Sequence, residues 1–151
     1  VPVAWLLTGD APLADELGPF LGTWAHPARP VVQLVVLEHV AAPGSIAADT
    51  LGDLTGLGMA PGHAPAEVVT AVPAFTPTAW VATSALERLK GRDVGHAVAH
   101  EVLHALGLEH RDGAGALMAE ARQPGASALS TSEWGTVRDA LRRLRATGGT
   151  P

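Results

Sequence analysis

One stretch of eleven residues constrains this chain more than any other part of it. Residues 100–110 read HEVLHALGLEH. On a helix, His100 and His104 lie one above the other on the same face, because they are four residues apart. Two imidazoles in that arrangement can bind one metal ion. Glu101 is not needed as a ligand, and it is placed to take a proton from a water molecule that the metal activates.

The position of His110 predicts that the helix ends before it. If the helix continued, His110 would be rotated by roughly 120° from the face of His104 and displaced by about 9 Å along the axis. Gly107 lies between them, and glycine adopts at no steric cost the left-handed conformation that ends helices. We therefore predict a helix over residues 92–107, a turn at Gly107 and a return of His110 to the metal. Three protein ligands leave one position open for water, as in catalytic zinc sites.

These residues also carry a resemblance to a known family. The pattern H-E-x-x-H-x-x-G-x-x-H is similar to the active-site helix of the metzincin zinc endopeptidases, in which a turn containing methionine follows. Here Met118 follows in the stretch 115–118, which reads GALM. Within that clan the chain most resembles the matrixins, the group of the matrix metalloproteinases, whose turn also reads Ala-Leu-Met. Residues 129–133, LSTSE, resemble the start of the matrixin C-terminal helix.

The resemblance implies a fold and a set of roles. It implies one metzincin-like catalytic domain over residues 1–151, with an upper subdomain to about residue 107, a lower subdomain from about 108 to 151, and the metal in the cleft between them. Glu101 would be the catalytic base, and Met118 would pack beneath the metal without binding it. Zinc would be held by three histidines: His100, His104 and His110. We also expect a secreted or extracellular monomer that acts on a protein or peptide substrate.

Hydrophobic periodicity and turn residues predict the remaining elements. We predict strands at residues 3–8, 31–40, 67–72 and 78–83, helices at 10–24 and 45–54, and a short helix or turn at 84–90. A last helix begins after a cap at Ser130 or Ser132 and runs to about residue 145. Residues 56–65 hold several glycines and prolines, which predicts a loop. The order of these elements indicates an α+β fold, with an α/β-like upper part built on a mixed, twisted sheet.

Composition excludes several classes of partner and ligand. A chain of 151 residues favours one domain, and its net charge of −5 argues against nucleic acid as the main partner. The absence of cysteine excludes disulfide bonds and thiolate ligands. No apolar run is long enough to span a membrane. Since the chain begins at Val1 without a basic segment ahead of an apolar one, we expect a processed or trimmed form.

Other histidines and the arginines of the last helix have plainer interpretations. His96 lies one turn before His100 on the same face, and a packed or supporting histidine is favoured over another ligand because His110 already completes the set. His63 lies in a stretch rich in glycine and proline, where a surface position is the simplest interpretation and a place in a substrate cleft is the alternative. A solvated helix face explains the remaining basic group, Arg138, Arg142 and Arg145.

The chain departs from the matrixin pattern in three places. Arg111 follows the third histidine, where matrixins usually have serine. Ala119 and Glu120 follow Met118, which alters the usual wall of the specificity pocket. The loops rich in glycine and aspartate that hold structural zinc and calcium in matrixins have no counterpart before residue 100. We therefore expect a single metal ion and no dependence on calcium.

The favoured hypothesis from the sequence is a zinc-dependent endopeptidase. The peptide would lie extended along an edge strand, for which residues 67–72 and 78–83 are the candidates. Two alternatives stay open: a zinc- or peptide-binding module without turnover, and a zinc amidase that acts on a non-peptide amide. Activity on peptides, with and without a chelator, distinguishes the three.

Overall fold

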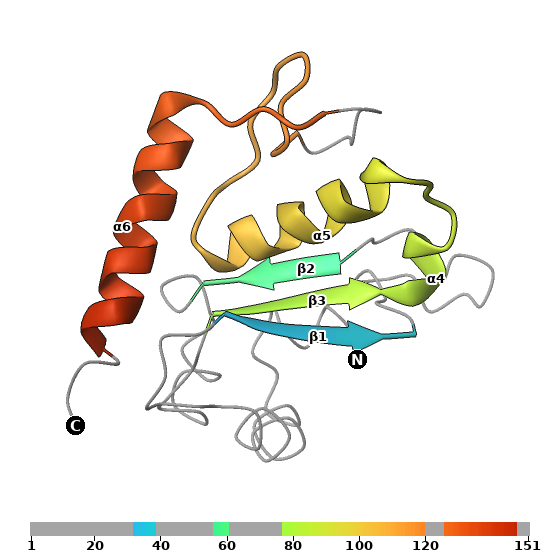
Figure 1. Ribbon diagram of the computed structural model, residues 1–151, viewed down its shortest axis with the longest axis horizontal. Helices are drawn as coiled ribbons and strands as arrows, with labels where there is room; N and C mark the ends of the chain where they lie inside the picture. The colour runs from blue at the N-terminus through green and yellow to red at the C-terminus, as the bar shows by residue number, and fades with distance from the viewer. Residues whose placement is uncertain (1–31, 39–55, 61–76, 120–125, 148–151) are drawn as a thin grey trace, which may run out of the picture.

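The computed structural model describes residues 32–38, 56–60, 77–119 and 126–147, and these form a mixed sheet with packed helices (Figure 1). This arrangement is an α+β fold. Its elements are β1 (Gln33–Leu37), β2 (Gly56–Met59), β3 (Thr78–Ala82), α4 (Thr83–Leu86), α5 (Arg92–Ala105) and α6 (Thr131–Thr147).

The three strands form one sheet in the order β1-β3-β2. β1 runs parallel to β3, with Gln33 opposite Thr78, whereas β2 runs antiparallel to it, with Leu57 opposite Trp80. All five residues of β3 are buried, as expected for a strand with a neighbour on each side. β1 instead alternates between half-buried and exposed residues, and Leu34 and Val36 are on its exposed side. β3 is therefore the centre of this sheet.

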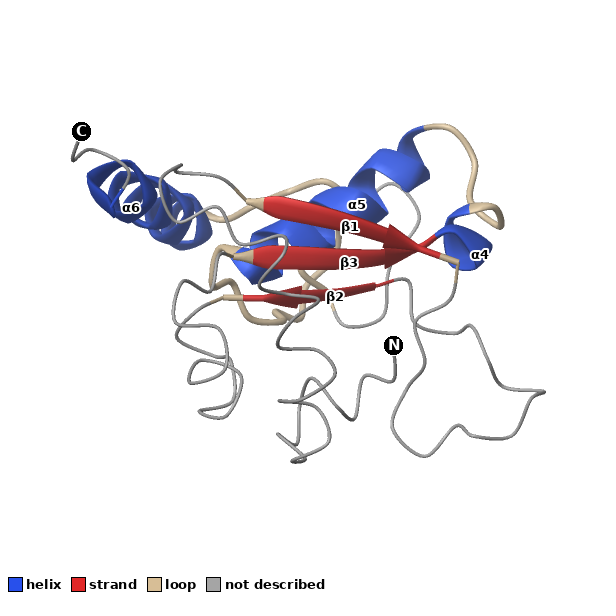
Figure 2. Cartoon of the chain, turned by 90° about the horizontal axis from the view of Figure 1, so that it is seen from below, coloured by secondary structure: helices blue, strands red, loops and turns tan. Residues whose placement is uncertain are grey.

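Helix α5 lies along one face of the sheet (Figures 1 and 2). It approaches β2 most closely at Gly58, where an added Cβ atom would run into the backbone of Glu101 and Ala105 and the Cβ atom of His104. Glycine is thus required at this position for space, because any side chain would separate the strand from the helix. The contact brings the backbone of β2 against the turn of α5 that carries the predicted site.

Helix α5 ends in a Schellman motif centred on Gly107. The N–H of Gly107 donates to the carbonyl of His104 at 2.9 Å, and the N–H of Leu108 donates to the carbonyl of Leu103 at 3.0 Å. Gly107 has φ +92°, a conformation that residues with a side chain rarely adopt. The predicted turn is therefore confirmed, and the helix ends two residues before the predicted boundary of 107.

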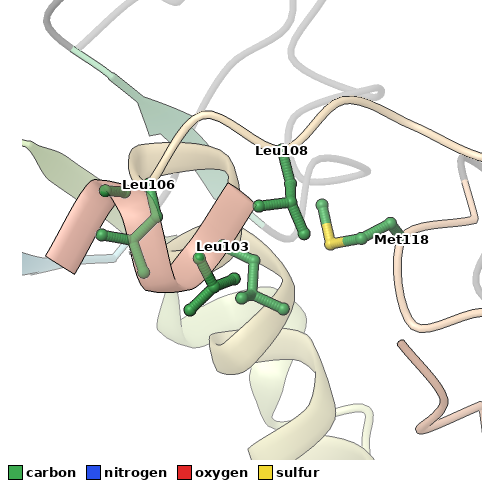
Figure 3. Close-up of a cluster of buried hydrophobic side chains, with 6 residues drawn as sticks. Leu103, Leu106, Leu108 and Met118 are labelled. Atoms are coloured by element: carbon green, nitrogen blue, oxygen red, sulfur yellow. The ribbon is translucent and has the colours of Figure 1, made fainter. Parts of the chain in front are cut away.

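A hydrophobic cluster joins the end of α5, the loop after it and α6. Leu103, Leu106 and Leu108 belong to one cluster with Met118, whose side chain is fully buried and lies next to Leu108 (Figure 3). Val137 and Ala140 complete the cluster from α6, which lies beside the C-terminal end of α5 and is steeply inclined to it (Figure 1). This packing fixes the loop after α5 to both helices.

Helix α6 begins with a capping box. The hydroxyl of Ser130 accepts the N–H of Glu133 at 3.3 Å, and the carboxylate of Glu133 accepts the N–H of Ser130 at 2.6 Å. Of the two caps that the sequence offered, Ser130 is the one used. The reciprocal bonds satisfy backbone N–H groups that the first turn of a helix leaves without partners.

The structure confirms most of the predicted elements that it describes and corrects one. Residues 78–82 form a strand, and a short helix followed by a turn comes next. The prediction that residues 56–65 form a loop was wrong for 56–59, which form β2. Glycine content signals a turn when only local propensity is considered, but here it permits the close approach of β2 to α5. The predicted elements at 3–8, 10–24, 45–54 and 67–72 lie outside the described residues.

None of the helices in residues 77–119 and 126–147 combines the length and the apolar character needed to cross a membrane.

Replacement of Gly58 by alanine tests the close approach of β2 and α5. We expect Gly58→Ala to lower the free energy of unfolding by about 1–3 kcal/mol, because the added methyl group overpacks the contact. Gly135→Ala is the matched control: it lies on α6, where an added Cβ meets nothing within 4 Å. There alanine should raise the free energy of unfolding by about 0.5–1 kcal/mol. Chemical denaturation measures both, and an unchanged stability for Gly58→Ala would contradict the contact.

Candidate metal centre

The three histidines of the motif converge on one point. His100 and His104 project from α5, and His110 returns to them from the loop after the Schellman motif. The Nε2 atom of His104 lies 3.0 Å from that of His100 and 3.0 Å from that of His110, and the Nε2 atoms of His100 and His110 are 3.3 Å apart. The predicted ligand set is thus brought together in full, and it could hold a metal ion.

Backbone carbonyls determine which nitrogen of two imidazoles carries the proton. Nδ1 of His100 lies 2.8 Å from the carbonyl oxygen of Leu117, and Nδ1 of His104 lies 2.7 Å from that of Leu108. A carbonyl can only accept, so in each neutral ring Nδ1–H donates and Nε2 keeps its lone pair. Hydrogen bonds of this kind orient ligating histidines and increase their basicity.

The chemistry and spacing of these nitrogens fit a metal ion. Lone pairs that point at one another at such short distances repel unless a cation lies between them. A tetrahedral ion with Zn–N bonds of about 2.0–2.1 Å holds its nitrogen ligands roughly 3.3–3.4 Å apart. The observed separations are close to that value. His110 is exposed while His100 and His104 are half-buried, so the nitrogen triangle lies at the protein surface.

Glu101 lies beside the triad without belonging to it. Its exposed fraction is only 6 %, and it is not part of the ligand group found among the described residues. Burial raises the pKa of the Glu101 carboxyl to about 7, and a hydrogen bond from the backbone N–H of Gly58 limits the rise. β2 therefore supplies a backbone donor to a carboxyl group that α5 carries.

The turn that contains Met118 supports the site through its backbone. The carbonyl of Leu117 accepts the hydrogen bond from Nδ1–H of His100, and the N–H of Leu117 donates to the carbonyl of Ala128 at 3.0 Å. Met118 itself fills the hydrophobic cluster (Figure 3) and is not among the ligand group of the described residues. Its predicted burial is confirmed, and its position beneath a metal ion stays a prediction. The supporting carbonyls of Leu108 and Leu117 were missed, because every residue has a carbonyl and the sequence does not show which one a ring will meet.

The remaining candidates do not join the triad. His96 is half-buried on α5, and its Nδ1 atom is buried without a hydrogen-bond partner in the described part of the chain. His63 lies outside the described residues. Arg138, Arg142 and Arg145 are exposed on α6, where Arg142 pairs with Asp139 at 3.1 Å.

Comparison with known proteins adds no family to these observations. No protein-family model matches the chain, and neither curated proteins nor solved structures gave a match.

The geometry predicts that the chain binds one zinc ion and that removal of one histidine of the triad lowers the affinity for zinc. We expect His104→Ala to lose most of its zinc affinity, because the remaining two imidazoles make a poor site. His96→Ala is the matched control, since it removes an imidazole from the same helix outside the triad. Metal analysis and titration with a chelating dye measure both variants. Full zinc occupancy in His104→Ala would show that the ligand set is misassigned.

Proposed function

We propose that this chain is a zinc-dependent endopeptidase of the metzincin type. The observation that carries the proposal is the convergence of three Nε2 atoms, two of them with their tautomer set by a backbone carbonyl. A buried glutamate directly follows the first of these histidines, which supports hydrolysis over metal storage. The resemblance of residues 100–118 to the metzincin pattern agrees with this chemistry.

In this proposal the histidines bind the metal ion and Glu101 transfers the proton. His100, His104 and His110 would hold zinc through neutral imidazoles, and zinc, when bound, supplies a Lewis acid and lowers the pKa of a water molecule to about 7. Glu101 would accept a proton from the water molecule that attacks the carbonyl carbon of the peptide bond. The same carboxyl then donates the proton to the nitrogen of the leaving amine. The N–H of Gly58 holds the carboxylate in place during both transfers.

The sheet topology changes where an extended peptide can bind. One predicted strand, residues 78–83, is excluded, because β3 pairs with β1 and β2 and has no free edge. The other, residues 67–72, lies outside the described residues. β2 is an edge strand among the described residues, and it contacts α5 beside Glu101 and His104. A peptide that adds to β2 by backbone hydrogen bonds would pass the metal site.

Substitution of Glu101 tests the proposed mechanism, because it separates metal binding from turnover. Glu101→Gln keeps the size of the side chain and leaves all three histidines in place, so the variant should stay folded and retain its zinc. It cannot take a proton, and kcat on any peptide that the parent cleaves should fall by about 10²–10⁴-fold. Zinc content and cleavage of a fluorogenic peptide library, with and without chelator, give the two readouts.

Substitution of an exposed glutamate gives the matched control for Glu101→Gln. Glu87→Gln makes the same change at an exposed position after α4 and should keep the parent's rate. Cleavage by Glu101→Gln at the parent's rate would exclude Glu101 as the base. A parent that holds zinc but cleaves no peptide would contradict the endopeptidase, and release of amine from non-peptide amides would then favour the amidase.

A further inference from the structure

The third ligand is supported differently from the other two. The rings of His100 and His104 are each oriented by a hydrogen bond from Nδ1 to a carbonyl. Within the described residues His110 makes no such bond, and its ring is exposed. Its position must therefore be set by the backbone on either side, so the neighbouring residues have to be held in place.

The residue after His110 is fixed at two points. The backbone N–H of Arg111 donates to the carbonyl of Met118 at 2.8 Å, which joins the loop to the buried turn. The side chain of Arg111 donates from Nε to the carboxylate of Glu133 at 3.0 Å. The two contacts tie the backbone beside His110 both to the hydrophobic cluster and to the start of α6.

Glu133 is a rigid anchor for this contact. Its exposed fraction is 9 %, and its second carboxylate oxygen accepts the N–H of Ser130 in the capping box. Although burial alone would raise the pKa of Glu133, hydrogen bonds from Ser130 and Arg111 and the charge of Arg111 hold it below its usual value. A charge-assisted bond to a carboxylate that is already held on one side leaves the arginine little freedom.

We propose that Arg111 and Glu133 are positioning residues of the metal site, and that their ion pair holds His110 where it can complete the ligand set. The inference rests on the proposed binding of zinc by the triad. Among the described residues the hydrogen bonds of Arg111 go to Glu133 and Met118 and not to the ring nitrogens of the three histidines, so it would act through the backbone that it shares with His110. Without the pair, His110 has to be ordered at the moment of binding, which weakens affinity for the ion.

Zinc affinity of the variants, measured by competition with a chelating dye, tests this role without using activity. We expect Arg111→Ala to bind zinc about 10–100-fold more weakly than the parent, the usual effect of losing a group that supports a ligand. Arg111→Lys restores a cation without the planar guanidinium and should recover part of the loss. In Glu133→Gln the amide oxygen can still accept the N–H of Ser130, so both bonds of the capping box are kept, while an NH2 group replaces the oxygen that accepts from Arg111. The substitution therefore removes the charge and the acceptor for Arg111, and it gives a second measurement if Arg111→Ala does not fold.

Two controls separate positioning of the ligand from stability of α6. Ser130→Ala removes the hydroxyl that caps α6 but leaves the contact between Arg111 and Glu133, so it should lower the unfolding midpoint and keep zinc affinity within about twofold. Asp139→Ala removes the exposed ion pair with Arg142 on the same helix and should change neither quantity.

Each outcome decides the proposal. A selective loss of zinc affinity in Arg111→Ala and Glu133→Gln, with both controls unchanged in affinity, supports it. Parental affinity in Arg111→Ala overturns it, and so does an equal loss in Ser130→Ala, because the effect would then come from the stability of α6. A parent that takes up no zinc overturns the metal site itself, and that failure is distinct from a parent that binds zinc regardless of Arg111.

Discussion

Helix α5 has to end within the five residues that separate His104 from His110, and the rest of the site depends on how it does so. The left-handed conformation of Gly107 reverses the chain, and the two Schellman hydrogen bonds close the last turn. Leu108 then packs into the hydrophobic cluster, and its carbonyl accepts the hydrogen bond from Nδ1–H of His104. One change in backbone conformation thus ends the helix, places Leu108 in the core and brings His110 back to the other two histidines.

Two sets of side chains on α5 are supported by different parts of the fold. The histidines are held from the side of the loop and the methionine-containing turn, whose carbonyls orient the rings of His100 and His104. Glu101 is buried and receives its hydrogen bond from Gly58 of β2. Because the sheet supports the carboxyl group and the loop supports the histidines, the proposed function predicts that a substitution on one side alters turnover and leaves metal binding intact.

The sequence allowed the convergence of the three histidines to be predicted because each constraint on it is local. The spacing of His100 and His104, and a glycine between them and His110, follow from helix geometry alone. The edge strand β2 was missed because its residues have no local preference for a strand, and only pairing with β3 and contact with α5 explain it. The pair of Arg111 and Glu133 joins residues 22 positions apart, a distance over which no pattern in a single sequence connects them.

The most direct measurement of the central claim is X-ray absorption spectroscopy of the zinc-loaded protein. If all three histidines bind through Nε2, the spectrum will show three imidazole nitrogens at about 2.0–2.1 Å and one further light-atom ligand. The multiple-scattering features of the rings count imidazoles separately from carboxylate or water ligands. A shell with two imidazoles, or one made mainly of oxygen, would show that His110 does not return to the ion and would contradict the account.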